Sequence, residues 1–145
     1  MNAPADGVVL NGPPREHPDM TADFAWWWDG ISAGEIRVQR CADCGVTRHP
    51  PHVRCIQCGS FNYTWNTAGE RGRVYSYVTY HHPQLPGFTY PYTVGTIEVA
   101  PGIRVVAPMW PNDGTGISVD GDVVVAWTTD MSGAPWPYYT PVVAR

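Results

Sequence analysis

The chain has 145 residues, of which 15 are proline and 15 are glycine, and 15% are charged. This length allows one domain or two very small ones, and so many turn-forming residues favour short strands over a helical bundle. The formal net charge is −4 and all nine basic residues are arginines, so Schiff-base catalysis and a lysine-dependent phosphate loop are excluded within this sequence.

Residues 1–18 are predicted to form a flexible tail, because they are rich in proline, glycine and asparagine and show no periodicity. They lack the basic segment and the long apolar run of a secretory signal. No stretch of the sequence is long and apolar enough to span a bilayer. We therefore expect a reduced, cytoplasmic protein without membrane contact.

Residues 19–34 are predicted to form a short amphipathic helix. Asp19 is suited to cap its N-terminus, and Gly34 is a natural stop. The apolar residues that share one face at helical spacing are Phe24, Trp27, Trp28 and Ile31. Trp26 falls on nearly the opposite side, so it either packs on another element or marks a surface for a partner or ligand.

Two cysteine pairs are the strongest chemical signal in the chain. They read Cys41-Ala-Asp-Cys44-Gly45 and Cys55-Ile-Gln-Cys58-Gly59. Each pair presents two thiolates from one tight turn, and the glycine lets the backbone turn back toward sulfur. A closed set of four thiolates leaves no open coordination position, so the spacing predicts a structural Zn²⁺ site rather than a catalytic one.

Two other chemistries use cysteines in such pairs. Disulfides need an oxidising compartment, for which the N-terminal sequence offers no support. Iron in the same cage would make an electron carrier, and the sequence leaves this alternative open, although zinc is favoured.

Residues 35–67 are predicted to form a small zinc ribbon. The stretch from Glu35 to Arg40 reads as a strand that leads into the first cysteine pair. After the second pair, Phe61, Tyr63 and Trp65 alternate with polar residues, which predicts a half-buried strand. Because so small a unit cannot hold a large core, its order is expected to depend on the metal.

Residues 68–145 are predicted to form a five-stranded barrel of the oligonucleotide/oligosaccharide-binding (OB) type with a C-terminal extension. The strand-like runs are Arg73 to Tyr80, Tyr92 to Val99, Ile103 to Trp110, Ile117 to Val119 and Val123 to Thr128. The predicted fold class is thus mainly β, with an N-terminal helix, a zinc ribbon and the barrel. The long loop from His81 to Pro91 is the connection richest in functional groups.

Large aromatic side chains also occur in two proline-rich segments, one around Trp110 and one from Ala134 to Pro141. Proline cannot donate to a sheet ladder, so these segments are not expected to be all central strands. The rings either cap the ends of the barrel or meet another chain. We expect Trp136 to Tyr139 to help bind a partner.

The order of these parts resembles one protein family. The matching segments are the tryptophan-rich helix, Gln39-Arg40-Cys41-Ala42-Asp43-Cys44-Gly45, Pro50-Pro51, Gly72-Arg73-Val74-Tyr75-Ser76-Tyr77 and Gly121-Asp122-Val123. From about Asp19 to Pro141 the chain resembles the zinc-ribbon plus OB-fold proteins, formerly a domain of unknown function, that accompany thiolase-like enzymes of acyl-CoA metabolism. One departure concerns an arginine that many relatives carry soon after the first prolines, where this chain has Pro51-His52-Val53-Arg54.

The resemblance implies a rubredoxin-like ribbon whose ligands are Cys41, Cys44, Cys55 and Cys58. It also implies an accessory subunit that binds acyl-CoA together with a thiolase-fold or lipid-transfer-protein-like enzyme. Some members assemble with a hotdog-fold hydratase and with an aldolase that shortens steroid side chains by retro-aldol cleavage, which is the reaction implied here. Others serve acyltransferases or thiolases, which is the alternative.

A CoA moiety carries several phosphates and an adenine ring, so its site calls for arginine forks and aromatic faces. The candidate residues for binding a CoA thioester or the partner are Trp26, Arg48, Arg54, Arg71, Arg73, Tyr80, His81, His82 and Phe88.

Catalysis by this chain alone is not expected. His81 and His82 are adjacent and therefore point to opposite sides of an extended segment, and no nearby nucleophile with an acidic partner suggests a triad. Single-stranded nucleic acid is a further alternative, since zinc ribbons and OB-folds often bind it. The acidic net charge disfavours this alternative, because such binding needs a positive groove.

Overall fold

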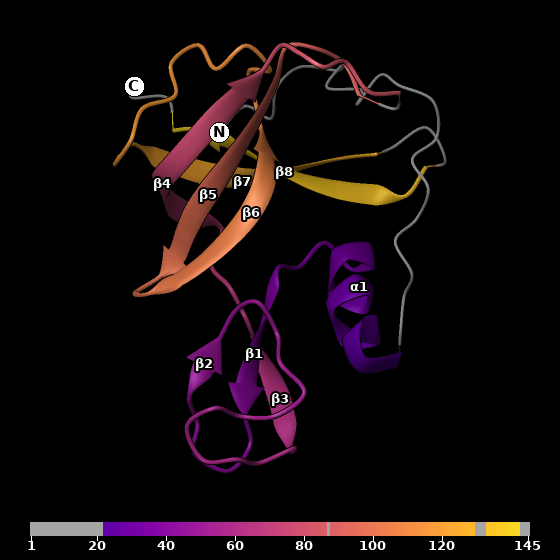
Figure 1. Cartoon of the computed structure of the whole chain (residues 1–145), viewed down its shortest axis with the longest axis vertical. Helices are drawn as coiled ribbons and strands as arrows, with labels where there is room; N and C mark the ends of the chain where they lie inside the picture. Colours follow the sequence, from indigo (N-terminus) through magenta and orange to yellow (C-terminus); the bar gives the residue numbers. More distant parts are fainter. Residues whose placement is uncertain (1–21, 87, 130–132, 143–145) are drawn as a thin grey trace.

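A computed structural model describes residues 22–86, 88–129 and 133–142 (Figure 1). The predicted tail at 1–18 and the predicted cap Asp19 lie outside these residues. The elements are η1 (Ala22–Phe24), α1 (Ala25–Ser32), β1 (Arg37–Cys41), β2 (Thr47–Arg48), β3 (Tyr63–Thr67), β4 (Arg71–Tyr80), β5 (Tyr92–Ala100), β6 (Ile103–Met109), β7 (Asp122–Thr129) and β8 (Pro135–Pro141). Within the described part of the chain, no helix has the length and apolarity to cross a membrane.

The predicted mainly-β architecture is confirmed. A three-stranded ribbon sheet in the order β2-β1-β3 precedes a closed barrel in the order β4-β5-β6-β8-β7. Strand β3 starts at Tyr63 rather than Phe61, and the prediction that it is half-buried is wrong, since all five of its residues are exposed. The ribbon sheet is too small to cover both faces of this strand.

The fifth barrel strand differs from the prediction. Ile117 to Val119 is not a strand but part of the connection between β6 and β7, where the Ile117 N–H donates to the carbonyl of Gly114 at 3.1 Å. This segment is apolar because the Ile117 side chain belongs to the core of the barrel. The strand that closes the barrel is β8, from the proline-rich C-terminal segment.

The prolines of β8 occupy positions that need no donor toward β7. The Val142 N–H donates to the Asp122 carbonyl, whereas the Tyr139 carbonyl accepts from the Trp110 N–H, next to the one bridge between β6 and β8. The backbone N–H and C=O groups of the even-numbered residues of β8 therefore point toward β7, and those of the odd-numbered residues point toward β6. Pro135, Pro137 and Pro141 are odd-numbered, so the pairing with β7 loses no hydrogen bond to them.

The expectation that Trp136 to Tyr139 forms a partner surface is wrong for the two tyrosines. Tyr139 is 0% exposed and lies in the core cluster, and Tyr138 is buried too. Burial also raises the pKa of the Tyr139 phenol to about 12. This segment is therefore a wall of the barrel.

Helix α1 ends in a glycine-dependent cap. Gly34 has φ 75°, the Glu35 N–H donates to the Gly30 carbonyl at 2.8 Å, and the Gly34 N–H donates to the Ile31 carbonyl at 3.1 Å. This pair of bonds satisfies the last carbonyls of the helix, as the predicted stop at Gly34 requires.

Helix α1 lies between the ribbon and the barrel and packs on both (Figure 1). Ile31 is part of the barrel core, and Trp27 and Trp28 pack against it, as the helical spacing predicted. On the other side, Trp26 stacks on Trp65 of β3 with the ring centroids 5.9 Å apart. Trp26 thus packs on another element, the first of the two alternatives that the sequence left open.

We expect Ile31→Ala to lower the free energy of unfolding by about 2–4 kcal/mol, because it removes a buried side chain that joins α1 to the barrel. Urea denaturation followed by tryptophan fluorescence measures this change. The control is Ser32→Ala, an exposed neighbour, which should shift stability by less than about 0.5 kcal/mol. Equal stabilities of the two variants would contradict the packing described for α1.

Candidate metal centre

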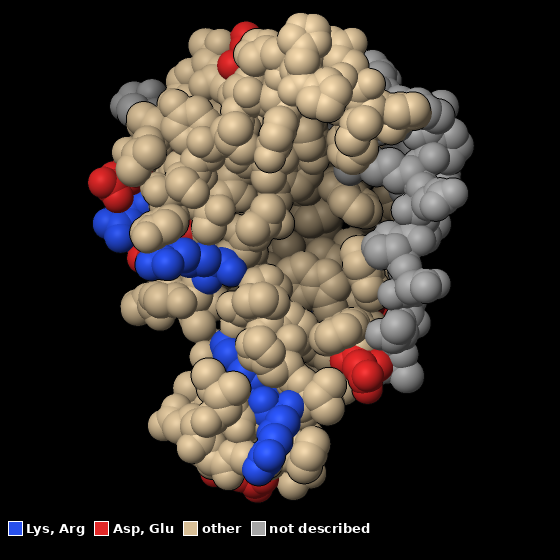
Figure 2. Space-filling model, in the orientation of Figure 1, with Lys and Arg blue, Asp and Glu red and all other residues tan. Residues whose placement is uncertain are grey.

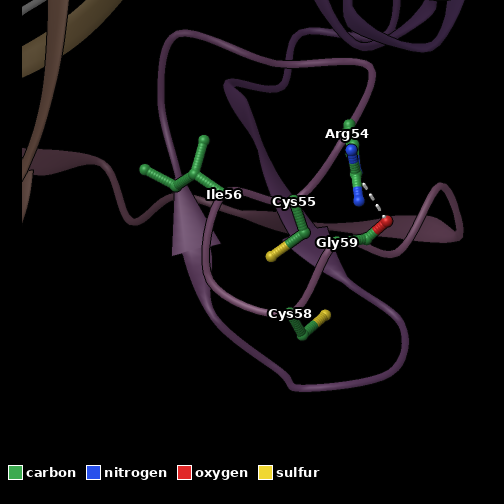
Figure 3. A pocket seen from close by; sticks show the side chains of 5 residues that line it. All are labelled: Arg54, Cys55, Ile56, Cys58 and Gly59. Carbon is green, nitrogen blue, oxygen red and sulfur yellow. Dashed lines mark hydrogen bonds between the residues drawn. The ribbon is translucent and has the colours of Figure 1, made fainter.

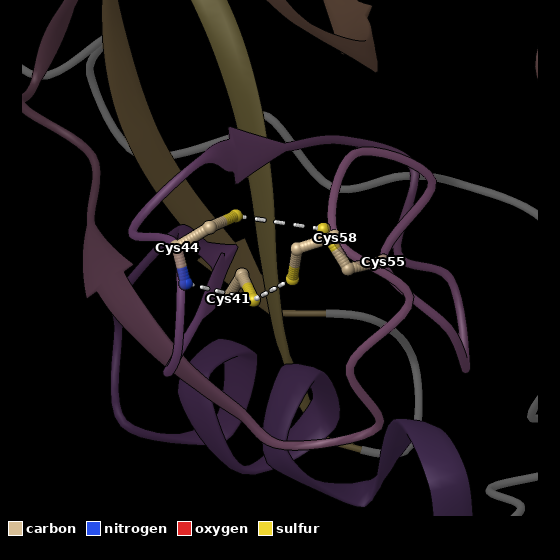
Figure 4. A group of neighbouring side chains, drawn as sticks. All are labelled: Cys41, Cys44, Cys55 and Cys58. Carbon is tan, nitrogen blue, oxygen red and sulfur yellow. Dashed lines mark hydrogen bonds between the residues drawn. The ribbon is translucent and has the colours of Figure 1, made fainter.

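The four cysteines come together at one end of the ribbon (Figure 4). Their sulfur atoms all lie within 4.8 Å of one another. Cys41 Sγ is 3.6 Å from Cys58 Sγ, and Cys44 Sγ is 3.7 Å from Cys55 Sγ. A Zn–S bond of about 2.3 Å gives a tetrahedron with edges of about 3.8 Å. Because a disulfide needs about 2.05 Å between sulfurs, the arrangement fits a tetrahedral metal and not cystines.

The two cysteine pairs have the same backbone geometry. The glycine N–H after each pair donates to the carbonyl of the first cysteine, at 3.1 Å for Gly45 and 2.8 Å for Gly59. Both glycines have positive φ, at 77° and 79°. In the first turn, the Cys44 N–H points at Cys41 Sγ, 3.5 Å away. The two turns therefore present their sulfurs in the same way, each by backbone geometry.

Each turn is closed by the arginine before it, a role that sequence reasoning missed. Arg40 Nε donates to the Gly45 carbonyl at 3.4 Å, and Arg54 Nε donates to the Gly59 carbonyl at 3.0 Å (Figure 3). The signal was present as a six-residue repeat, Arg-Cys-x-x-Cys-Gly, in both turns. Two guanidiniums beside the cluster also offset part of the charge of four thiolates.

Asp43 links the two cysteine turns by hydrogen bonds. Its carboxylate, from the first turn, accepts a hydrogen bond from the hydroxyl of Ser60 after the second turn. It also accepts one from Asn62 Nδ2 at 3.2 Å. The relative position of the cysteine pairs is thus held by side chains as well as by β1 and β3.

The pKa values of Cys41 and Cys58 are shifted in opposite directions. The hydrogen bond from the Cys44 amide lowers the pKa of Cys41 to about 6. The Ser60 amide lowers the pKa of Cys58, but burial and the other three thiols outweigh it and raise that pKa to about 12. Four adjacent thiolates repel one another, so a cation is what allows all of them to ionise together.

The ribbon also holds the helix through a half-buried histidine. The His49 ring lies 5.1 Å from the Trp27 ring, and its Nδ1 is buried without a hydrogen-bond partner. Burial lowers the pKa of this imidazole. His49 is therefore held neutral at the contact between ribbon and helix.

The candidate residues for CoA or partner binding do not form one site. Trp26 is buried against Trp65, and Arg48 is only 9% exposed. The Arg48 guanidinium donates to Gln39 Oε1 at 2.6 Å and to the His52 carbonyl at 3.3 Å. Both side chains are therefore engaged within the protein.

The remaining candidates lie at separate places. Arg54 is on the second cysteine turn. Arg71 and Arg73 begin β4, whereas Tyr80 ends it and is followed by the loop that holds His81, His82 and Phe88. Since a strand rises about 3.3 Å per residue, the two ends of β4 are about 30 Å apart. One CoA ester therefore does not contact the whole set.

Three surface hollows of the described residues contain no catalytic set. One, of about 480 Å³, lies on the second cysteine turn and is lined by Arg54, Cys55, Ile56, Cys58 and Gly59 (Figure 3). A second, of about 490 Å³, lies between the ribbon and the β5–β6 turn and has no ionisable lining residue. A third, of about 130 Å³, has Asp23 and His52 in its lining but no serine, threonine or cysteine.

Comparison with known proteins places both parts of the chain in described families. Residues 28–64 match the family model of the ChsH2 rubredoxin-like zinc ribbon domain, and residues 65–128 match that of the ChsH2 C-terminal OB-fold domain.

Two curated relatives are each 34% identical to the chain. One, over 131 residues, is a probable enoyl-CoA hydratase alpha subunit of Thermomonospora curvata. The other, over 102 residues, is the 3-oxo-4,17-pregnadiene-20-carboxyl-CoA hydratase alpha subunit of Mycobacterium tuberculosis. The matches cover 90% and 70% of this chain but only 41% and 32% of those relatives.

Two solved structures are also similar. The Ltp2-ChsH2(DUF35) aldolase matches with a TM-score of 0.81 and 34% identity, covering 88% of this chain and 100% of that one. A DUF35 protein of unknown function from Sulfolobus solfataricus matches with a TM-score of 0.57 and 15% identity, covering 84% of this chain and 87% of that one. The second likeness concerns the fold alone.

We expect Cys44→Ser to abolish retention of zinc, which the unchanged protein should hold at about one ion per chain. Elemental analysis after gel filtration measures the metal, and visible absorbance identifies iron if iron is bound instead. The control is Gln57→Ala, an exposed residue between Cys55 and Cys58, which should keep the metal. Full metal content in Cys44→Ser would rule out the four-sulfur site.

His49 should make stability fall in acid. Its folded-state pKa lies below its ordinary value of 6.5, so the unfolded chain takes up the proton first and stability is lost as the pH falls below 6.5. We expect His49→Gln to lose less stability than the unchanged chain between about pH 7.5 and about pH 5.5, measured by urea denaturation. Replacing the exposed His52 by Gln is the control, and an identical pH dependence for His49→Gln would disprove the assignment.

Proposed function

The chain belongs to the ChsH2 family of zinc-ribbon and OB-fold proteins, and from this premise we propose that it is an accessory subunit of a thiolase-like acyl-CoA enzyme. The enzyme would be an aldolase that cleaves a carbon–carbon bond in a CoA thioester. The chain helps to form the CoA-ester site and stabilises the complex, and a hotdog-fold hydratase is a further partner.

One observation carries this proposal. This chain matches a chain of the Ltp2-ChsH2(DUF35) aldolase over 100% of that chain's length, at 34% identity and a TM-score of 0.81. The three hollows described above add support, since none of these three combines a nucleophile with a histidine and a carboxylate. Both observations favour a subunit that works beside a catalytic partner.

The proposed reaction is the retro-aldol shortening of a steroid side chain. A hydratase of the kind named for the second curated relative adds water across a double bond. If that bond is conjugated to the thioester, the product is a β-hydroxy thioester. A base on the partner removes the hydroxyl proton, a carbonyl forms at the β carbon, the α–β bond breaks, and the thioester enolate takes up a proton. This chain supplies no group to those steps.

The metal would be a structural Zn²⁺ held by Cys41, Cys44, Cys55 and Cys58, and it would order the ribbon without touching substrate. We assign the division between ribbon and barrel to residues 35–67 and 68–145, in line with the change of sheet between β3 and β4.

Arg71 is the arginine of the predicted set best suited to a CoA phosphate. It is exposed at the start of β4, and no ion pair joins it to another described residue. Arg73, in contrast, already bonds Glu98 at 3.2 Å. The exposed residues Tyr80, His81, His82 and Phe88 are then candidates for contact with the partner or the acyl group.

Co-expression with a lipid-transfer-protein-like, thiolase-fold enzyme tests this function. We expect a stable complex that cleaves a 17-hydroxy steroid CoA thioester, no cleavage by this chain alone, and at least about tenfold less cleavage by the partner alone. Arg71→Ala should raise KM with kcat unchanged, whereas Gln57→Ala, at an exposed ribbon residue, should leave KM unchanged. Failure to form a complex, or undiminished cleavage without this chain, would refute the proposal.

A further inference from the structure

The outer face of strands β4, β5 and β6 is an exposed, mostly apolar sheet surface, called here the β4–β6 face. Its cross-strand rows are Val78–Val94–Pro108 and Ser76–Thr96–Val106. The side chains that stand out from it are Tyr75, Val78, Tyr80 and Val106, and Val106 is 70% exposed. Soluble proteins rarely leave such rows uncovered unless the surface binds something.

This face is almost free of charge. No aspartate, glutamate, lysine or arginine occurs from Val74 to Ile97, nor from Val105 to Met109. In Figure 2 the barrel surface over these strands is correspondingly tan, and the charged side chains lie around its edges and on the ribbon. Low charge in the centre of a surface is the compositional mark of a protein interface.

A charged row closes the face at its ribbon end. Arg73, Glu98 and Arg104 are cross-strand neighbours. The Glu98 carboxylate is 3.2 Å from Arg73 Nη2 and 3.6 Å from Arg104 Nε, so one acid serves two guanidiniums. Asp120 reaches Arg73 only at 3.9 Å. Among the described residues, Arg73 thus has a second acid, whereas Arg104 has only a share of Glu98.

Arg104 is also held at the edge of the apolar rows. Its guanidinium carbon lies 3.7 Å from the centre of the Tyr75 ring. Tyr75 stands at the irregularity in the pairing of β4 with β5, between Val74 and Ser76. A bulge of this kind turns a side chain out of the regular sheet. The guanidinium is thus pre-oriented on an exposed aromatic ring.

These charges discriminate between occupants of the face. A second copy of the chain would bring the same arginines, and Glu98, the acid of these three strands, is already shared. Nucleic acid would need a row of free cations along the face, where none exists. A different protein that presents an apolar surface with a carboxylate opposite Arg104 fits both features.

We propose that the β4–β6 face is the surface on which the thiolase-like partner docks, with Val106 and Val78 in its centre and Arg104 paired to an acidic side chain of the partner. This inference rests on the proposed function and adds the location of the interface. It also assigns the contact to the barrel wall rather than to the cysteine turns.

The test measures the dissociation constant of the complex with the co-expressed thiolase-like enzyme for charged variants of this face. Val106→Asp and Val78→Asp should each weaken binding at least tenfold, and Arg104→Glu should do the same, with a loss that shrinks at high salt. Val106→Thr, which keeps the shape, should bind like the unchanged chain. The control is Ile56→Asp, at an apolar side chain 89% exposed on the ribbon, which should not alter binding.

Metal content and urea denaturation verify that each variant is folded. Wild-type affinity in all three charged variants would overturn this inference and leave the proposed function standing, whereas absence of a complex with the unchanged chain would overturn the function itself. A homodimer broken by Val106→Asp, or tight salt-dependent binding of an oligonucleotide lost in Arg104→Glu, would assign the face to another occupant and also overturn the inference.

Discussion

Four sulfur atoms within 4.8 Å of one another are the constraint on which the ribbon depends. Unscreened thiolates at this distance repel one another, and the neighbouring thiols help to raise the pKa of Cys58. A tetrahedral cation removes it and turns two backbone turns into one unit. Because β3 is exposed along its whole length, packing alone contributes little to the order of this region.

Helix α1 joins the ribbon to the barrel by packing on both. One side of the helix supplies Ile31 to the barrel core, and the other stacks Trp26 on Trp65. Gly30 lets Arg37 lie against the helix, where its guanidinium donates to the Trp26 carbonyl at 3.0 Å and covers the Trp65 ring. An eight-residue helix could not stand alone in water, so its stability comes from these two contacts.

The interior of the barrel is packed with core side chains. Tyr139, Ile97 and Met109 fill the inside, with Ile117 from the β6–β7 connection. Gly95 faces the Met109 side chain so closely that a Cβ there would collide with it. Side chains of this kind usually fill the interior of a small barrel, which is consistent with a role through surface contacts.

The sequence by itself determined the parts whose signals are local: the cysteine pairs, the helix face of Trp27, Trp28 and Ile31, the cap at Gly34, and four of the five barrel strands. It also contained the repeat that marks Arg40 and Arg54 as equivalent. Tertiary structure alone decided what depends on distant partners. Ile117 was predicted to lie in a strand because it is apolar. Strand β8 was not predicted because it contains prolines, and the cost of a proline depends on whether its missing N–H would have bonded a neighbouring strand. The arginines and aromatic rings do not form one site, since residues nine positions apart on a strand, such as Arg71 and Tyr80, lie at opposite ends of the barrel. Only the closed sheet determines which residues share a face.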